Sequence, residues 1–261
     1  NTQEKCAYDD EIISIGGKII YVPAPDKKNI LNYTNKLSRI MVNNGPYKCV
    51  HSHSMYFNGI VTQAAYRADI PIRISHAHTI SDGRSNSIYR SIYRNIMRKK
   101  ILKYSTKLFG CSQEACKNLY GDKCFDDKIV KVINNGIELK RFEDKDLGKS
   151  SKLIKVELGL PLDSIIIGHV GRFHSQKNHV LLVDIFSELI KKEPKARLIL
   201  VGDGPLKEYI KEKVKGKRLE KYIYFLGIRE DIPKIMASLD VFIFPSKYEG
   251  LGIVLIEAQA A

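Results

Sequence analysis

No stretch of this sequence approaches the roughly 20 apolar residues that a membrane-spanning helix needs, and no signal peptide is recognisable after Asn1. The five cysteines form no CxxC pair and lack zinc-like spacing to the histidines. Reduced thiols are therefore expected rather than a structural zinc site. Internal repeats and low-complexity segments are also absent from the sequence. These absences favour a folded protein with a cytoplasmic location.

The 261 residues are 44% hydrophobic and 28% charged, a composition that can bury the cores of two domains. Short apolar runs alternate with helical patterns, which predicts an α/β fold with two doubly wound parallel sheets. Strands are expected at 19–22, 48–51, 72–75, 108–111, 165–171, 196–201, 223–226 and 239–244. The main helices are expected at 30–43, 58–68, 180–191, 206–215 and 232–238.

A polar stretch at 144–155, with a cluster of glycine and serine, predicts the linker between two domains. We therefore expect an N-terminal domain at 1–148 and a C-terminal domain at 149–261. The chain opens with Asn1 rather than Met and stops at Ala261 inside a helical pattern. For this reason we expect a fragment whose two domains are both incomplete.

The formal net charge of +14 needs an anionic partner or another explanation. From Tyr89 to Lys107, apolar side chains recur at helical spacing and basic side chains fill the other positions. This pattern predicts a basic amphipathic helix, and we expect its apolar stripe to lie in the core. A second interpretation is that the charged face attracts anionic lipid headgroups. Nucleic-acid binding is the third, but no binding motif accompanies the charge.

The most informative segment is the last, FIFPSKYEGLGIVLIEAQAA, from Phe242 to Ala261. Proline and glycine break its apolar pattern before a helix that is expected to begin near Ile253. Free backbone N–H groups, a helix N-terminus and two carboxylates, Glu249 and Glu257, thus come together. Donors at a helix start suit a phosphate, and a carboxylate can accept hydrogen bonds from sugar hydroxyls. The combination predicts a site for a sugar nucleotide.

Four segments, in this order, resemble the retaining glycosyltransferases of family 4: VGRFHSQKN (170–178), LILVGDGPL (198–206), YFLGIREDIPKIMASLDVFIFPS (224–246) and EGLGIVLIEA (249–258). The last holds two glutamates separated by seven residues, as in that family. The resemblance is clearest from Ile129 to the end. It implies the GT-B fold, in which two Rossmann-like domains face a cleft. It also implies sugar transfer from a nucleotide donor with retention of anomeric configuration, without a metal or a cofactor.

The resemblance further implies that Arg172 and Lys177, which follow the expected strand at 165–171, hold the donor diphosphate. Fixed cations stabilise the charge on a departing phosphate without a metal. The backbone N–H groups at the start of the last helix are implied to meet the phosphate as well. They belong to Gly250, Leu251 and Gly252.

In the same family, a carboxylate in the position of Glu257 accepts hydrogen bonds from the ribose hydroxyls. Glu249 is implied to be a catalytic residue that contacts hydroxyls of the transferred sugar. The nucleotide base is implied to lie near a glycine turn, which lets backbone approach a flat ring, and near the strand end that follows it. The residues concerned are Gly202, Gly204, Ile228 and Arg229.

Two histidine-rich segments, HSHS (51–54) and HAHT (76–79), follow or end expected strands. Zinc would normally want a further Cys, Asp or Glu at workable spacing, so we expect no metal ligands here. The family has a histidine at a corresponding strand end, close to the donor sugar and the acceptor. His78 is the first choice for it and His76 the second. Such a histidine could orient the sugar or accept the acceptor proton.

We therefore predict a metal-independent retaining glycosyltransferase that moves a sugar, expected from a UDP-sugar, to a saccharide or lipid-linked saccharide in surface polysaccharide biosynthesis. The expected partners are the donor, the acceptor and an anionic surface at the inner face of the membrane, but no nucleic acid. Two alternatives stay open: a non-catalytic nucleotide-sugar-binding partner subunit, and a nucleotide-sugar epimerase on the same fold. An epimerase needs acid and base groups around the sugar, and the sequence shows no identifiable cluster of this kind.

Overall fold

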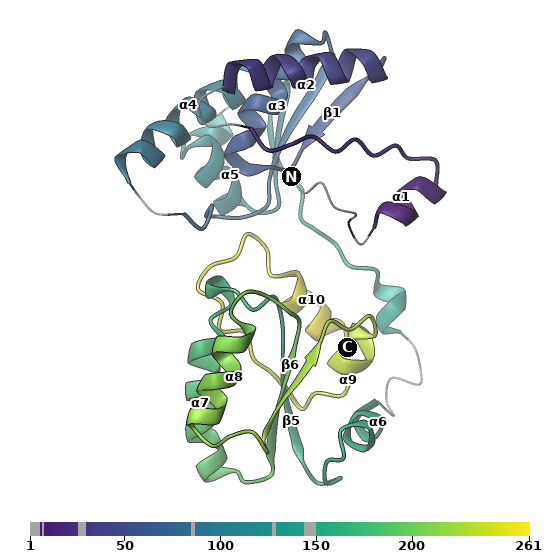
Figure 1. The fold of residues 1–261 in the computed structure, drawn as a ribbon, viewed down its shortest axis with the longest axis vertical. Coiled ribbons are helices and arrows are strands. Elements are labelled where there is room, and N and C mark those ends of the chain that lie inside the picture. The colour runs from purple at the N-terminus through teal and green to yellow at the C-terminus, as the bar shows by residue number, and fades with distance from the viewer. Residues whose placement is uncertain (1–5, 7, 26–29, 85–86, 127–128, 144–149) are drawn as a thin grey trace. The chain divides into compact units, whose positions relative to one another are not determined.

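The computed structural model describes residues 6, 8–25, 30–84, 87–126, 129–143 and 150–261 (Figure 1). The chain divides into two compact units. Unit 1 comprises Asn1–His76, Asn86–Phe109 and Leu119–Lys131, and unit 2 comprises Ala77–Ser85, Gly110–Asn118 and Val132–Ala261. The domain boundary predicted between 148 and 149 touches residues outside the described ranges and stays a prediction.

The strands among the described residues form two four-stranded sheets. The first has the order β1-β2-β3-β4, with β1 (Cys49–Ser52), β2 (Ile72–Ala77), β3 (Lys107–Gly110) and β4 (Val130–Val132). The second has the order β7-β6-β5-β8, with β5 (Ile165–Val170), β6 (Ala196–Val201), β7 (Ile223–Gly227) and β8 (Val241–Phe242). β1 pairs in parallel with β2, and the pairs within the second sheet are parallel throughout. The predicted α/β class with two parallel sheets is confirmed.

Helices connect the strands close to the positions that the sequence predicted. The earlier helices are α1 (Asp9–Ser14), α2 (Ile30–Asn44), α3 (Asn58–Arg67), α4 (Ile88–Tyr104) and α5 (Gln113–Tyr120). The later ones are α6 (Ser150–Glu157), α7 (His179–Lys192), α8 (Lys207–Gly216), α9 (Ile232–Ala237) and α10 (Ile253–Ala260). Short 3-10 turns include η3 (Leu139–Phe142) and η5 (Ser175–Lys177).

The sheet of unit 2 is covered on both faces, as Figure 1 shows for α7 and α8 on one side and α9 on the other. Side chains of β6 alternate between two cores because successive strand residues point to opposite faces. Leu198 and Leu200 are fully buried with residues of α7 and α8. Ile199 and Val201 instead pack with Ile154 of α6 and Ile235 of α9. This two-sided burial explains why β6 continues after Arg197 as an unbroken apolar run from Leu198 to Val201.

The strand predicted at 19–22 is not present: these residues have no assigned strand structure. Their contacts are made by side chains instead of a backbone ladder. The Tyr21 hydroxyl donates to the Asp9 carboxylate, and Lys18 Nζ donates to Asn44 Oδ1 at 2.5 Å. A β-prone tetrapeptide becomes a strand only where a neighbouring edge pairs with its backbone groups.

Two further predictions need correction within unit 2. The linker predicted at 144–155 extends too far, because α6 begins at Ser150 and Ile154 is buried in the core. The strand predicted at 239–244 is reduced to the two residues of β8, which pair with β5 at the edge of the sheet. Pro245 follows and has no N–H to extend the ladder.

The basic helix α4 differs from prediction in what it buries. Met97 and Ile101 lie in the core, but the apolar side chains of the first half point to solvent. Ile88 and Tyr89 are 78% and 87% exposed, and Ile92 and Ile96 are about half exposed. The expectation that the whole stripe is buried is therefore wrong. Among the described residues, no helix combines the length and apolarity required to cross a bilayer.

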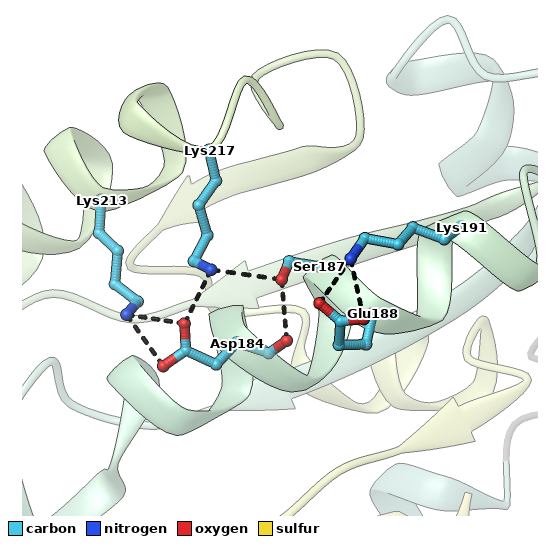
Figure 2. Close-up of polar contacts among 6 residues, drawn as sticks. All are labelled: Asp184, Ser187, Glu188, Lys191, Lys213 and Lys217. Atoms are coloured by element: carbon cyan, nitrogen blue, oxygen red, sulfur yellow. Dashed lines mark hydrogen bonds and ion pairs between the residues drawn. The ribbon is translucent and has the colours of Figure 1, made fainter.

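Ion pairs join α7 to α8 on the surface of unit 2 (Figure 2). The Asp184 carboxylate lies 2.8 Å from Lys213 Nζ and 3.1 Å from Lys217 Nζ. Lys217 also donates to Ser187 Oγ at 3.3 Å. The hydrogen bond from Lys213 holds the pKa of Asp184 below its usual value. Because these side chains are partly exposed, we expect only a small contribution to stability.

Candidate functional site

A hollow of about 570 Å³ lies at the carboxyl ends of β5, β6 and β7 in unit 2. This edge is where doubly wound sheets bind their ligands. Three loops contribute to its lining. The lining residues are Val170 at the end of β5 with Gly171 and Arg172 after it, Val201 at the end of β6 with Gly202, Asp203 and Gly204 after it, Ile228 and Arg229 after β7, and Ile232 at the start of α9. Five predicted donor-site residues, Arg172, Gly202, Gly204, Ile228 and Arg229, therefore share one hollow.

The glycine turn after β6 brings backbone directly against the loop after β5. Gly202 has φ +130°, and a Cβ there would clash with the carbonyl oxygen of Gly171. Its N–H donates to the carbonyl of Gly227 at 2.7 Å, and Phe173 N–H donates to the carbonyl of Asp203 at 3.0 Å. Only glycine meets both the steric and the φ requirement at position 202. The turn thus forms a backbone-lined wall of the hollow.

Asp203 stabilises the turn from within. Its carboxylate accepts from Lys207 Nζ at 2.7 Å and from Gly204 N–H at 2.6 Å. The Lys207 hydrogen bond lowers the pKa of Asp203 below its usual value. The paired carboxylate of Asp203 therefore stabilises the loop. Its position on the lining is not by itself evidence that it binds a ligand.

Arg229 has two carboxylate partners. Its guanidinium donates to Asp231 at 2.8 Å and to Glu157 of α6 at 2.5 Å. The hydrogen bonds to Asp231 and then to Glu157 raise the pKa of Arg229. Because its charge is matched, Arg229 fixes the turn after β7. The neighbouring Ile228 is 80% exposed and offers an apolar surface on the hollow.

Lys177 and Glu249, 72 residues apart in sequence, form an ion pair in which Lys177 Nζ lies 2.7 Å from Glu249 Oε1. Both side chains are about one-fifth exposed. The Lys177 stem packs beside Gly171, so the pair adjoins the lining of the hollow. Lys177 Nζ also lies 5.3 Å from the centroid of the Phe244 ring, within range of a cation–π contact.

Three hydrogen bonds between segments 174–178 and 245–249 position this pair. We call these two hydrogen-bonded segments the clasp. Gln176 Nε2 donates to the carbonyl of Tyr248 at 2.8 Å, and Lys247 N–H donates to the carbonyl of Gln176 at 2.9 Å. Asn178 Nδ2 donates to the carbonyl of Pro245 at 3.2 Å. Sequence analysis did not assign roles to Gln176 and Asn178, although both lie in the SQKN part of a recognised motif.

The helix α10 begins at Ile253, as the sequence predicted. Its N-cap, Gly252, supplies no side-chain hydrogen bond to the first turn, in which the N–H groups of Ile253 and Leu255 donate to the carbonyls of Leu251 and Gly252. A Cβ on Gly250 would clash with the carbonyl of His78, and both residues belong to unit 2. Leu251 and Glu257 are half-buried. Glu257 stands in the second turn of α10, outside the lining of the hollow.

The two histidine candidates occupy different surroundings. His76 is the fifth residue of β2 and is buried. Its Nδ1 lies 3.1 Å from Nε2 of His51 on β1. His78 follows the end of β2, belongs to unit 2 and is half-buried. The structure therefore separates the two residues, and the catalytic role of His78 stays a prediction.

Two buried histidines lie near the loop that follows β5. His169 of β5 places Nδ1 2.9 Å from the carbonyl of Ile243, so this nitrogen carries the proton. His179, at the start of α7, stacks on Phe173 with a centroid distance of 4.1 Å. Burial lowers the pKa of His169, and burial with the nearby His169 lowers the pKa of His179 to about 3. His179 is therefore a packing residue of the core.

Comparison with known proteins matches both parts of the chain to family models. Residues 3–141 match the Glycosyltransferase Family 4 model, and residues 150–261 match the model of Glycosyl transferases group 1. The chain is 36% identical to EpsF of Bacillus subtilis, with 99% of this chain and 67% of EpsF covered. It is 30% identical to the capsular polysaccharide biosynthesis glycosyltransferase CapH of Staphylococcus aureus, with 96% of this chain and 66% of CapH covered.

Among solved structures, the fold is similar to that of Anabaena Alr3699/HepE in complex with UDP-glucose. The TM-score is 0.79 at 20% sequence identity, and the match covers 98% of this chain and 68% of that one. The chain thus spans about two thirds of the length of these relatives. The matches agree with the fold described above and with the order of its motifs. The chain belongs to the family 4 glycosyltransferases and has their GT-B fold.

Proposed function

We propose that the protein is a retaining glycosyltransferase that uses a UDP-sugar in surface polysaccharide biosynthesis. The observation that carries this proposal is the hollow at the strand ends of unit 2, with the Lys177–Glu249 pair beside it. The similarity to a UDP-glucose complex and to a capsular polysaccharide enzyme supports the choice of donor and pathway.

Negative charge on the departing diphosphate is stabilised by fixed cations rather than by a metal. Lys177 Nζ has three N–H donors and gives one to Glu249, which leaves two for phosphate oxygens. Arg172 is exposed at the rim of the hollow and adds a planar set of donors. The uncapped first turn of α10 supplies backbone donors to the same group.

The remaining parts of the donor meet different residues. The base occupies the hollow between the glycine turn and Ile228, where an apolar surface faces a backbone wall. Glu257 accepts hydrogen bonds from the ribose hydroxyls, and Glu249 accepts from hydroxyls of the sugar while Lys177 holds it in place. In this arrangement the two carboxylates, Glu249 and Glu257, bind hydroxyl groups, and the two cations, Arg172 and Lys177, bind the diphosphate.

The transfer step breaks the bond between the anomeric carbon and the phosphate oxygen and forms a bond to the acceptor hydroxyl on the same face. The acceptor proton passes to the departing phosphate, so the configuration is retained without a carboxylate nucleophile. His78 orients the sugar through a hydrogen bond. The stabilisation of charge by Arg172 and Lys177 is greatest in the transition state, where it accelerates the reaction.

The acceptor is a saccharide or a lipid-linked saccharide, presented at an anionic membrane surface. The first half of α4 supports this location because it exposes Ile88, Tyr89, Ile92 and Ile96 on a helix rich in arginine and lysine. Apolar side chains enter the headgroup region while basic side chains neutralise anionic lipids. Replacing Ile88 and Ile92 by serine is expected to weaken sedimentation with anionic vesicles. Equal sedimentation of both proteins would contradict the assignment.

Donor binding is tested by calorimetric titration of the chain with UDP, UDP-glucose and GDP. Glu257→Gln is expected to lower UDP affinity about 10- to 100-fold, since it removes a charge-assisted acceptor. Glu188→Gln, which removes an exposed carboxylate paired with Lys191, is the matched control and should bind normally. Unchanged affinity in Glu257→Gln would refute the ribose assignment. UDP-insensitive binding to nucleic acid that falls steeply with salt would refute the donor site itself.

Turnover and stereochemistry need a separate measurement. Proton NMR of the product formed from a UDP-α-sugar should show the α configuration, and turnover should persist in a chelator. An inverted product would exclude the same-face step. Donor binding without transfer to any acceptor would favour the non-catalytic partner subunit, and a changed sugar in recovered donor would favour the epimerase.

A further inference from the structure

Three histidines of unit 1 converge at the carboxyl ends of β1 and β2. His51 lies in β1, His53 follows it, and His76 lies in β2. In the parallel register His51 is opposite Ile74, so continuing it places His53 opposite His76. Residues at a spacing of two along a strand share one face of a sheet. All three imidazoles therefore project on the same side at neighbouring positions.

The distances between the rings fit coordination of one small cation. One nitrogen from each ring can be chosen so that all three lie within 4.8 Å of one another. His51 Nε2 and His76 Nδ1 are 3.1 Å apart, and the His51 and His53 ring centroids are 4.1 Å apart. Two nitrogens bound to a tetrahedral zinc ion at about 2.0–2.1 Å are separated by roughly 3.3 Å. Rotation of the histidine side chains could therefore bring the three nitrogens to the distances that one metal ion requires.

The cluster is buried on one side and open to solvent on the other. His76 is buried at 7% exposure, whereas His51 and His53 are exposed. The Phe109 ring meets His51 and His76 edge-on, each at a centroid distance of 6.0 Å, and forms an apolar wall. Three protein ligands with solvent access leave a fourth position for water or an oxygen of a ligand.

A buried amide holds the two strand ends in place beneath the histidines. Asn58 is fully buried; its Oδ1 accepts from Ser52 Oγ at 2.7 Å, and its Nδ2 donates to Ser75 Oγ at 2.8 Å. Nδ2 also lies 3.4 Å from the carbonyl of His76. Such outer contacts limit the movement of the ligands and so favour metal binding.

We infer that unit 1 binds one Zn²⁺ through His51, His53 and His76, with an open fourth position. Imidazole nitrogens suit this metal, and the neutral form of each ring supplies the lone pair. The inference departs from the sequence-based expectation of no metal ligands, because that expectation looked for a fourth protein ligand. It concerns a site in unit 1 and does not depend on the donor chemistry proposed for unit 2.

The test uses the whole chain after treatment with a chelator and removal of the chelator. Exposed thiols also bind zinc, so the exposed residues Cys6 and Cys49 are first replaced by serine. Titration with Zn²⁺ should then give one tight site by calorimetry. Co²⁺ should show the visible absorption of a four-coordinate ion, a readout that does not require activity. His53→Asn tests a ligand at an exposed position, so that folding is preserved.

We expect His53→Asn to weaken Zn²⁺ binding at least about 100-fold, since removal of a ligand should exceed the 10- to 100-fold effect of losing an outer contact. His174→Asn, at an exposed histidine of unit 2, is the matched control and should bind as tightly as the parent. Absence of a tight site, or equal affinity in His53→Asn and the parent, would overturn the inference. Equal weakening by both variants would identify adventitious coordination and would overturn it as well.

Discussion

The buried histidine His179 predicts a loss of stability in mild acid that can be traced to one side chain. It is 2% exposed, stacks on Phe173, and lies 4.8 Å from the ring centroid of His169. Neither ring nitrogen of His179 has a hydrogen-bond partner among the described residues. Protonation in the folded state would place a charge in this apolar setting, which is why the pKa falls to about 3.

The sign and size of the effect follow from proton linkage. In the unfolded chain the imidazole titrates near pH 6.5, so between about pH 6.5 and 3 the unfolded state binds more protons than the folded state. The contribution is fully present above this window and is lost as the pH falls through it. At about pH 5, protonation of one unfolded histidine stabilises the unfolded state by about 2 kcal/mol. This value depends mainly on the unfolded pKa, because the folded group stays neutral at that pH.

The assay is urea unfolding followed by circular dichroism at about pH 8 and about pH 5, with variants His179→Phe and His179→Gln compared with the parent. The difference in unfolding free energy between the two pH values should be about 2 kcal/mol smaller in both variants. His174→Gln, at an exposed histidine, should retain the parental difference. The reasoning is refuted if both His179 variants show the same pH dependence as the parent.

Three further substitutions test other parts of unit 2. Gly202→Ala should lower the unfolding free energy by about 1–3 kcal/mol and abolish UDP binding, because of the positive φ and the clash with the carbonyl of Gly171. In the control Gly216→Ala the added Cβ meets open space, so stability and UDP binding should stay unchanged. Urea unfolding measures the stability, and calorimetry measures the binding. Glu157→Gln should lower UDP affinity several-fold by loosening the Arg229 turn, and normal affinity would contradict that link. Asp184→Asn should cost less than about 1 kcal/mol, with a smaller loss at high salt; a larger, salt-independent loss would be unexpected.

The elements of unit 2 could be predicted from sequence because local pattern and tertiary environment agree there. The apolar run of β6 from Leu198 to Val201 is buried on both faces, with Arg197 before it and Gly202 after it. Ser112 likewise caps α5 as its residue type predicts, since its Oγ accepts from Ala115 N–H at 3.2 Å. In such places each local preference supports the final fold.

Other features depend on partners that local sequence does not reveal. Residues 19–22 have a strand-like composition but make side-chain contacts instead of a ladder. The apolar side chains of α4 have helical spacing along its length, yet among the described residues Met97 and Ile101 are buried whereas Ile88 and Ile92 are exposed. Periodicity predicts which residues share a face, but it does not say what covers that face.

The candidate site shows the same limit. Motif order placed Arg172, Gly202 and Arg229 at strand ends, and the hollow contains all three. The ion pair of Lys177 with Glu249 joins residues that are 72 apart in sequence. Two side-chain donors, Gln176 and Asn178, and the backbone N–H of Lys247 position it, and motif order alone did not predict these contacts. The histidine cluster was visible as two short segments, but its convergence follows from the register of β1 with β2.

The clasp has a consequence for how this protein can be changed. The segment that carries Glu249 is held to 174–178 through its own backbone: the carbonyls of Tyr248 and Pro245 accept from the side chains of Gln176 and Asn178, and Lys247 N–H donates to the carbonyl of Gln176. A chimera that takes residues 245–257 from a relative should therefore keep these three bonds, provided that position 247 is not proline. A chimera that replaces Gln176 or Asn178 by an apolar residue should lose a bond. The side chains at 245–249 are thus free to vary, whereas those at 176 and 178 are not.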